Sequence, residues 1–319
     1  MLSIQEAAAR LNAHERIRVL THQSPDGDTL GCAGALCLGL RALGKQAQYV
    51  CADPIPEKYQ NMLRPLTVQT FDPDYIVAVD VADSKLLGAL EPVYAHCTDL
   101  GLDHHGSNTG WTQEAVVDAS AGAACEVIAL LLREMNVPIT PDVADCLYTG
   151  LCTDTGCFRY SNTTPRTLRL AAELMESGAD AAAINMRMFE IKTRSRLAIE
   201  RMALDGLEYA FEHRVAIMVL SQEMIAASGA TDSDLDGLAP IPRNIEGVQI
   251  GITIRERAPG DYKISVRTGN MVDASALCRT LGGGGHIRAA GCRLNGSRED
   301  VVQRMIDASA PFVRTEDTR

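Results

Sequence analysis

Aspartate and histidine residues gather in four short segments of this 319-residue chain. These two residue types supply oxygen and nitrogen ligands for divalent cations. Two such cations in one pocket are suited to cleaving phosphate esters, because paired cations activate a water molecule and stabilise both the attacking and the leaving oxygen. The four segments are residues 22–28, Asp80, residues 103–105 and Asp154.

Taken singly, most of these segments have an ordinary structural explanation. Asp26 and Asp28 flank a glycine in a Pro-Asp-Gly-Asp sequence, which is typical of a solvated tight turn after a strand. Asp80 and Asp154 could each cap a helix or begin a turn. The Asp-His-His triplet at 103–105 is more specific, because a ligating histidine usually has its other ring nitrogen held by a carboxylate or a carbonyl.

The four segments lie where predicted strands or helices end. Short β-branched runs predict strands, and longer runs without Gly or Pro predict helices. We expect strands at 16–21, 47–51, 74–79 and 97–102, and helices at 31–43, 122–135, 141–153 and 164–177. Strands alternating with helices predict an α/β fold with a doubly wound, mainly parallel sheet, whose loops meet in one crevice at the carboxyl ends of the strands. The four segments should therefore build a single site.

The second half of the chain has a different order of predicted helices and strands. A charged helix is expected at 194–209, followed by strands at 214–220, 248–255 and 262–267, with a turn at 258–261. Four glycines at 282–285 precede His286; such a segment is often a flexible linker, but its amides can also surround an anion. We expect a metal-binding domain at 1–190, a connecting helix at 191–210 and a smaller, mixed α/β domain at 211–319.

Composition argues against several classes of protein. No stretch approaches eighteen uninterrupted apolar residues, and the N-terminus lacks the apolar run of a signal peptide, so neither a membrane span nor secretion is expected. The ten cysteines form no Cys-x-x-Cys pair, which favours free thiols in a reducing cytoplasm. The formal charge of −11 argues against binding of long duplex nucleic acid, although a few local cations can hold a short nucleotide.

These motifs resemble those of the DHH phosphoesterase superfamily along nearly the whole chain. The series from His22 to Gly31, the strand-terminal Asp80, the triplet at 103–105 and Asp154 are similar to its four motifs. The sequence Gly-Gly-Gly-His-x-x-Ala-Ala-Gly at 283–291 resembles the signature of the DHHA1 accessory domain. Length and domain pair are most similar to the NrnA-type group of nanoRNases and phosphatases of 3′-phosphoadenosine 5′-phosphate (pAp).

The resemblance implies a set of metal ligands. One cation would be bound by His22, Asp26 and Asp80, and the other by Asp28, Asp80, His104 and Asp154, with Asp80 bridging the two. Mixed histidine and carboxylate ligands suit Mn²⁺, with Mg²⁺, Co²⁺ or Fe²⁺ as alternatives. Two departures from the superfamily pattern, Cys32 for a frequent Ser and Lys85 for a frequent Arg, fall outside this ligand set.

The resemblance also implies catalytic and substrate-binding residues. Catalysis would depend on Asp80, His104 and His105, with His105 assisting the leaving oxygen or the substrate phosphate. A terminal phosphate of the substrate would be held by residues of the second domain, with one further candidate in the first: His286, Gly284, Gly285, Arg267 and Arg159.

The implied function is hydrolysis of short oligoribonucleotides and of pAp by a cytoplasmic homodimer without a membrane partner. Two alternatives stay open. The enzyme could act mainly on pApA, the linear product of cyclic-di-AMP, or the chain could be a nucleotide-binding sensor without catalysis. The complete ligand set argues against the sensor.

Overall fold

The computed structural model describes residues 1–235 and 237–314. The sequence has a polar tail at 314–319, and all of it except Arg314 lies outside the described residues. The chain divides into two compact units, Met1–Ile191 and Lys192–Arg319. Each unit is built around its own apolar core. Within the described ranges, no helix combines the length and the apolar character that a membrane span requires.

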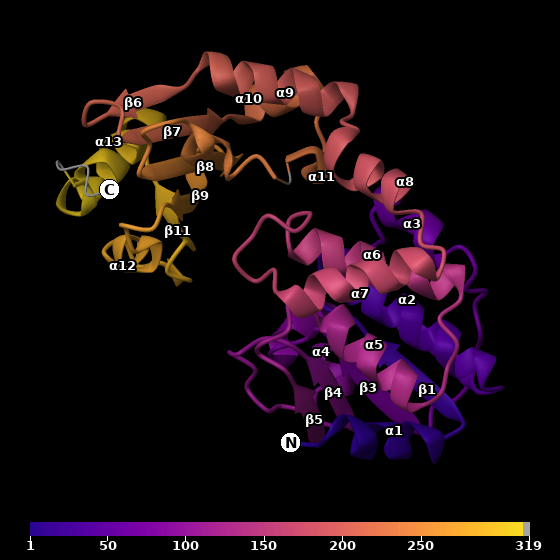
Figure 1. Cartoon of the computed structure of the whole chain (residues 1–319). Helices are drawn as coiled ribbons and strands as arrows, with labels where there is room; N and C mark the ends of the chain where they lie inside the picture. Colours follow the sequence, from indigo (N-terminus) through magenta and orange to yellow (C-terminus); the bar gives the residue numbers. More distant parts are fainter. Residues whose placement is uncertain (236, 315–319) are drawn as a thin grey trace. The chain divides into compact units, whose positions relative to one another are not determined.

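The first unit contains a five-stranded sheet in the order β2-β1-β3-β4-β5, with all neighbouring strands parallel (Figure 1). Its strands are β1 (Arg16–Leu20), β2 (Gln46–Val50), β3 (Tyr75–Val79), β4 (Leu100–Asp103) and β5 (Glu114–Val117). The predicted α/β fold with a parallel sheet is confirmed. Strand β5 was not predicted, because four residues are too few to show a periodic pattern.

Helices cover both faces of this sheet. They are α1 (Ile4–Asn12), α2 (Gly27–Ala42), α3 (Glu57–Leu63), η1 (Ser84–Leu90), α4 (Glu91–Tyr94), α5 (Ala124–Glu134), α6 (Pro141–Asp154), α7 (Pro165–Glu176), α8 (Ala181–Asn185) and the π-helical turn η2 (Met186–Glu190). Alternate residues of each strand face opposite sides. Val19 and Val77 lie in the main core with α2, α5 and α6, whereas Leu20 and Ala78 pack with Leu87 of η1.

Helix α2 begins four residues earlier than the sequence predicted. The side chain of Asp26 caps its N-terminus and accepts hydrogen bonds from the amides of Asp28 and Thr29, at 3.0 and 3.2 Å. The expected tight turn around Gly27 is therefore wrong, and Asp28 lies in the first helical turn. The Thr140 side chain caps α6 and accepts a hydrogen bond from the Val143 amide.

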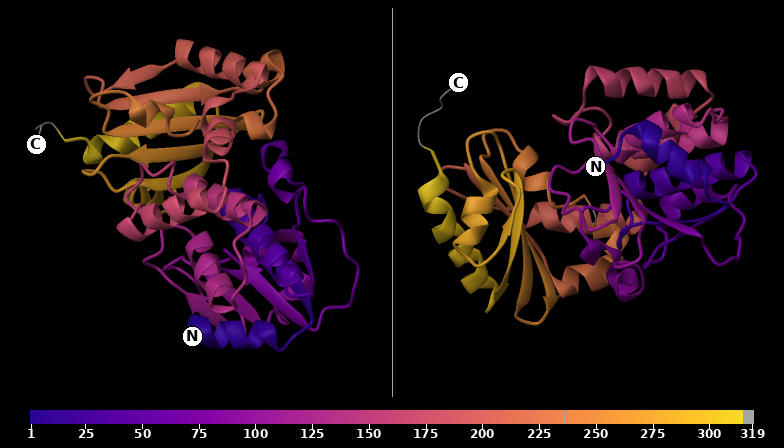
Figure 2. Two further views of the ribbon diagram at one scale, coloured as in Figure 1. Left: turned by 45° about the vertical axis from the view of Figure 1, so that its right-hand side comes forward. Right: turned by 90° about the horizontal axis from the view of Figure 1, so that it is seen from below.

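The second unit contains a six-stranded mixed sheet in the order β10-β11-β9-β8-β7-β6, in which only β7 and β8 are parallel to each other among the described pairs (Figure 2). Its strands are β6 (Glu208–Ala210), β7 (Val215–Leu220), β8 (Ile250–Ala258), β9 (Asp261–Thr268), β10 (Gly284–Gly285) and β11 (Ala289–Asn295). Its helices are α9 (Arg194–Asp205), α10 (Gln222–Ser228), α11 (Asp232–Leu235), η3 (Ile241–Asn244), α12 (Ala274–Arg279), α13 (Arg298–Ser309) and η4 (Ala310–Phe312).

Two expectations for the second unit are corrected. The helix predicted at 194–209 ends at Asp205, and β6 pairs with β7 instead. The run at 282–285 is not a bare loop, because β10 pairs with β11 and the Gly283 amide donates to the Cys278 carbonyl. Glycine allows this pairing because a Cβ at Gly283 would lie 2.2 Å from the Gly291 carbonyl oxygen.

Candidate metal centre

The predicted ligands lie at the carboxyl edge of the first sheet. In the strand order 2-1-3-4-5, strands are added toward one edge of the sheet up to β2 and toward the other edge from β3 onward. In folds of this kind, ligands bind in the crevice beyond the carboxyl ends of the two strands at this switch point, here β1 and β3. His22 follows β1, Asp80 follows β3, and His104 follows β4 directly. Asp154 is the last residue of α6, and Asp28 lies in the first turn of α2.

The structure brings all six predicted ligands into overlapping groups. In each group, one ligand atom per residue lies within 4.8 Å of the others, and the groups are His22 with Asp26 and Asp80, Asp28 with His104 and Asp154, and Asp80 with His104 and His105. Asp80 thus belongs to two groups, together with every histidine of the site. This arrangement has the donor atoms that two neighbouring cations require.

Backbone carbonyls orient the rings of His22 and His104. The Nδ1 atom of His22 lies 2.7 Å from the carbonyl oxygen of Gln23, and Nδ1 of His104 lies 3.2 Å from that of Ala121. A carbonyl only accepts hydrogen bonds, so Nδ1 carries the proton in both rings. Each Nε2 atom then presents a lone pair toward the carboxylates, and Asp80 lies 3.7 Å from both. This is the usual orientation of a metal-ligating histidine.

Asp80 lies in an environment that disfavours its charged form, and a bound cation would stabilise that form. Its side chain is buried, and its φ of 59° falls in the left-handed region, where Asp is tolerated better than most residues. Its Oδ1 atom and Nε2 of His104 are buried without a hydrogen-bond partner among the described residues. Burial and the neighbouring carboxylates Asp28 and Asp26 raise the pKa of Asp80 well above its ordinary value. Such unpaired donor atoms fit a cation site.

Asp28 is held by the N-terminus of α5. Its Oδ2 atom accepts a hydrogen bond from the Ala124 amide at 2.6 Å, and its Oδ1 atom accepts one from the Cys125 amide at 3.0 Å. Free amides at a helix start are natural partners of a carboxylate. Even so, burial raises the pKa of Asp28, and the neighbouring carboxylate of Asp26 raises it further.

Glycines let the helices that carry Asp28 and Asp154 approach closely. A Cβ on Gly31 of α2 would lie 2.4 Å from the Cys146 carbonyl oxygen of α6, and a Cβ on Gly150 would lie 2.7 Å from Oδ1 of Asp28. Both distances are shorter than real contacts. Gly31 is therefore needed for the close approach of the two helices that carry the predicted ligands Asp28 and Asp154, and it has no side-chain chemistry of its own.

Both units match known protein families. Residues 16–151 match the DHH family, N-terminal domain, and residues 214–314 match the DHHA1 domain. The bifunctional oligoribonuclease and PAP phosphatase NrnA of Thermus thermophilus is 32% identical over 312 residues, which cover 95% of this chain and 90% of that protein. The chain belongs to the NrnA-type DHH/DHHA1 phosphoesterases. The predicted family membership is thus confirmed.

Solved structures agree with this DHH/DHHA1 fold. An exopolyphosphatase-related protein from Bacteroides fragilis has a TM-score of 0.88 at 22% identity, and the match covers 97% of this chain and 96% of that one. The exonuclease RecJ bound to manganese has a TM-score of 0.60 at 16% identity, with 98% and 96% covered. At these identities the likeness shows the fold alone.

The predicted substrate-binding residues fall in both units. His286, Gly284 and Gly285 are exposed at β10, and the Arg267 side chain lies on β9, where Nη1 donates to the Val266 carbonyl at 3.1 Å. Arg159 belongs to the DHH unit. Its Nε atom donates to the Gly156 carbonyl at 2.5 Å, and its guanidinium lies 5.8 Å from the centre of the Phe189 ring.

Three residues that support the site were missed in the sequence. Asn162 donates through Nδ2 to the Gly122 carbonyl at 2.9 Å and to Oδ2 of Asp154 at 3.2 Å. Asn108 donates to Oδ2 of Asp103 at 2.6 Å. The Ala124 amide, at the start of a predicted helix, was foreseeable from the rule that helix N-termini bind anions. The two asparagines lie in polar turns that carry no comparable signal.

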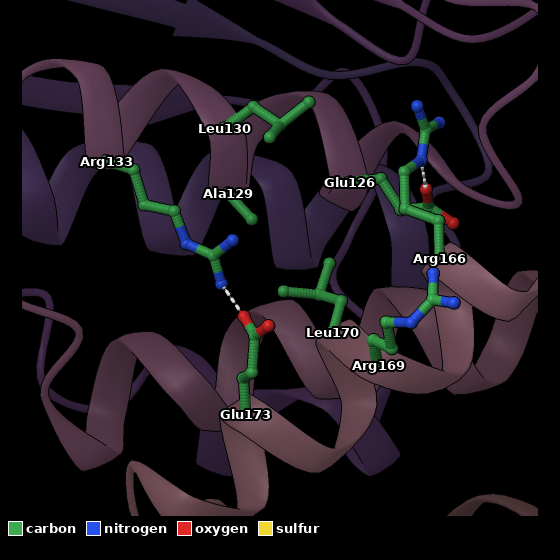
Figure 3. A pocket seen from close by; sticks show the side chains of 8 residues that line it. All are labelled: Glu126, Ala129, Leu130, Arg133, Arg166, Arg169, Leu170 and Glu173. Carbon is green, nitrogen blue, oxygen red and sulfur yellow. Dashed lines mark hydrogen bonds and ion pairs between the residues drawn. The ribbon is translucent and has the colours of Figure 1, made fainter.

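A hollow between α5 and α7 has a different character (Figure 3). Its volume is about 130 Å³, and its charged lining residues include Glu126, Arg133, Arg166 and Glu173. Arg133 pairs with Glu173, and Arg166 pairs with Glu126 at 2.5 Å. These pairs neutralise one another across the hollow, so it lacks the excess of negative charge that marks the metal centre.

Proposed function

We propose that this chain is a two-cation phosphoesterase that hydrolyses short oligoribonucleotides and pAp. The observation that carries the proposal is the pair of buried, unpartnered atoms, Asp80 Oδ1 and His104 Nε2, in the middle of a carboxylate and imidazole cluster. The name of the Thermus thermophilus relative supports these substrates, since that protein matches nearly the full length of this chain. Nothing comparable favours pApA as the main substrate or a purely sensory role.

The ligand assignment follows the two outer groups. His22, Asp26 and Asp80 would hold one cation, and Asp28, His104 and Asp154 would hold the other, with Asp80 reaching both. This donor set suits Mn²⁺, with Mg²⁺, Co²⁺ or Fe²⁺ as alternatives. When bound, the cations lower the pKa of a water molecule and stabilise negative charge on the phosphoryl oxygens.

His105 is placed to move a proton. Its Nδ1 atom donates to Oδ1 of Asp103 at 2.8 Å, which fixes the tautomer and leaves Nε2 available for substrate. The same hydrogen bond raises the pKa of His105, so the ring stays protonated at higher pH than a free imidazole. With its side chain 42% exposed, His105 can donate this proton to the leaving oxygen.

The second unit is proposed to hold the phosphate end of the substrate. His286, Gly284 and Gly285 are exposed, so a phosphate oxygen can reach the imidazole of His286. Arg267 on β9 is the proposed cationic contact in this unit, and Arg159 is a separate candidate for a phosphate contact within the first unit. Binding of one phosphate end would explain a preference for short oligonucleotides, since little protein surface is left to bind a long chain.

The test is a turnover panel with the full chain. We expect Mn²⁺-dependent release of products from pAp and from di- to pentaribonucleotides, little action on long duplex RNA, and no activity after chelation. Absence of cleavage of every short substrate with all four cations would overturn the assignment. Turnover of pApA alone would instead favour the dinucleotide alternative.

We also propose that the chain forms a homodimer through its first unit. Leu168 and Met175 lie seven residues apart, on the same face of α7, and are 51% and 54% exposed. Grouped apolar side chains on a surface commonly mark a contact between proteins. Light scattering should give a dimer for the natural chain and a monomer for Leu168→Glu with Met175→Glu.

A further inference from the structure

A second pocket of the first unit lies directly beside the metal centre. Its volume is about 200 Å³, and two of the predicted ligands, Asp26 and Asp154, line it. Thr153, which precedes Asp154 on α6, also lines the pocket. A group bound in this pocket would therefore lie next to the reacting phosphate, at a place to which neither the sequence motifs nor the ligand assignment gives a role.

The remaining walls come from two short elements. Helix α3 contributes Lys58 and Tyr59, and the π-helical turn η2 contributes Met188 and Phe189. Tyr59 is buried, whereas Met188 and Phe189 are partly exposed and pack against the main core. The lining of the pocket thus combines carboxylates with aromatic and thioether groups.

Cations lie over both aromatic rings. The Lys58 ammonium is 4.9 Å from the centre of the Tyr59 ring, and the Arg159 guanidinium is 5.8 Å from the centre of the Phe189 ring. Rings attract cations in this way and hold them in place. The lining therefore carries one cation, Lys58, and a second cation, Arg159, lies over the ring of the lining residue Phe189, which matches a ligand with a planar ring and a phosphate.

The backbone is unusual between Asp154, which lines the pocket, and Arg159. Gly156, Cys157 and Phe158 follow Asp154 and have φ values of 58°, 57° and 63°, which is a rare run of left-handed residues. Short π-helical turns such as η2 are also concentrated at functional sites. Strain of this kind persists where the surrounding structure over-determines it, commonly beside a binding site.

We propose that this pocket binds the nucleoside next to the scissile phosphate, with the base against Phe189 and Met188 and a non-scissile phosphate at Lys58. The inference rests on the proposed function and names its nucleoside subsite. A volume of about 200 Å³ lies below the roughly 300–1,000 Å³ of pockets for drug-sized ligands, so it suits one nucleoside. A stacked base gains affinity with little regard to sequence, because every base has a π-face.

The chemistry also predicts a dependence on cations. Asp26 and Asp154 would repel a phosphate on their own, so nucleotide binding should require the divalent cations that neutralise them. Phe189 would act on the base alone, whereas Lys58 would act on the phosphate. The two residues can therefore be separated with a ligand that has a phosphate and no base.

The experiment is calorimetric titration of AMP and of ribose 5-phosphate into the full chain loaded with Mn²⁺. Phe189→Ala should weaken AMP binding about ten-fold or more and change ribose 5-phosphate binding less than about two-fold. Lys58→Ala should weaken both ligands to a similar extent. Phe189→Leu keeps an apolar side chain and removes the π-face, and it should give a smaller loss for AMP only.

Two matched controls come from the same elements. Met186→Ala changes an exposed residue of η2, and Arg64→Ala removes an exposed cation next to the end of α3; neither residue lines the pocket. Both variants should bind AMP like the natural chain. Equal AMP and ribose 5-phosphate affinity in the natural chain, or an equal loss of both in Phe189→Leu, would overturn the subsite.

Binding and turnover separate this inference from the proposed function. Phe189-dependent binding of AMP without hydrolysis of pAp or short RNA would support the subsite and reject the enzymatic assignment. Normal hydrolysis together with AMP binding that does not depend on Phe189 would support the enzymatic assignment and reject the subsite.

Discussion

Nδ1 of His105 donates a hydrogen bond to Oδ1 of Asp103, and the same oxygen accepts hydrogen bonds from the amides of His104 and His105 at 2.7 and 3.2 Å. The sequence suggested that Asp103 would hold a ligating histidine. The structure shows that Asp103 holds the ring of His105, whereas a backbone carbonyl orients His104. One carboxylate therefore fixes both the turn and the tautomer of the proposed proton donor.

Replacing Asp103 by Asn should shift the pH dependence of turnover. The hydrogen bond with Asp103 raises the pKa of His105, so removing the negative charge lowers it. If protonated His105 is needed, the fall of kcat at high pH should move to lower pH in Asp103→Asn. The measurement is kcat against pH with pAp. Asn108→Ala keeps the negative charge of Asp103, so the fall of kcat at high pH should occur at the same pH as in the natural chain.

Asp80→Ala should abolish cation binding, because Asp80 belongs to both proposed ligand groups. Turnover should fall by at least about 100-fold as a result. Bound Mn²⁺ should be measured by elemental analysis after desalting, together with activity on pAp. Asp72→Ala removes an exposed carboxylate of the same unit and should behave like the natural chain. Near-normal activity of Asp80→Ala would rule out the bridging role.

Mn²⁺ should stabilise the protein more at high pH than at low pH. Burial raises the pKa of Asp154 from 3.8 to about 7. Without cations, Asp154 thus contributes stability that is complete below pH 3.8 and is lost as the pH rises through about 7. A cation needs the ionised form, so its affinity through this group should fall about ten-fold per pH unit below 7.

The measurement is the shift in Tm on adding Mn²⁺ at about pH 5.5 and about pH 8. A larger shift at the higher pH is expected. In Asp154→Asn, the difference between the two pH values should shrink. A shift that is the same at both pH values in the natural chain contradicts the prediction.

His286→Ala should raise KM for substrates that end in a phosphate more than for a reporter without one. His286 is exposed beside β10, so the substitution removes a phosphate contact without opening a cavity. Lys263→Ala alters an exposed residue of β9 in the same unit and serves as the control. Equal changes in KM for both classes of substrate would exclude a role in phosphate recognition.

Gly283 and Gly284 form a matched pair for stability. An Ala at 283 would place its Cβ 2.2 Å from the Gly291 carbonyl oxygen and 2.9 Å from Cα of Cys292, whereas a Cβ at 284 meets nothing within 4 Å. Overpacking against backbone should cost Gly283→Ala about 1–3 kcal/mol of unfolding free energy. Gly284→Ala should change it by less than about 0.5 kcal/mol, as urea unfolding of the two variants can show.

Much of the fold could be predicted from local patterns. The β-branched run at 16–21 and the apolar run at 74–79 became β1 and β3, because a buried parallel strand needs such a run. Shorter elements could not be predicted. Strands β5 and β10 have four and two residues, and they exist because neighbouring strands pair with them. The end of α9 was also missed, since pairing with β7 overrides helical preference at 208–210.

The sequence by itself determined the chemistry of the site and its edge of the sheet. Ligand preference is a property of residue type, and parallel strands place their carboxyl ends together whatever the details of packing. The tertiary structure decided the rest. The left-handed backbone of Asp80, the carbonyl behind each ring and the amides that hold Asp28 depend on contacts between residues far apart in the chain. Such contacts cannot be predicted from the local sequence, so only the folded chain determines the geometry of the site.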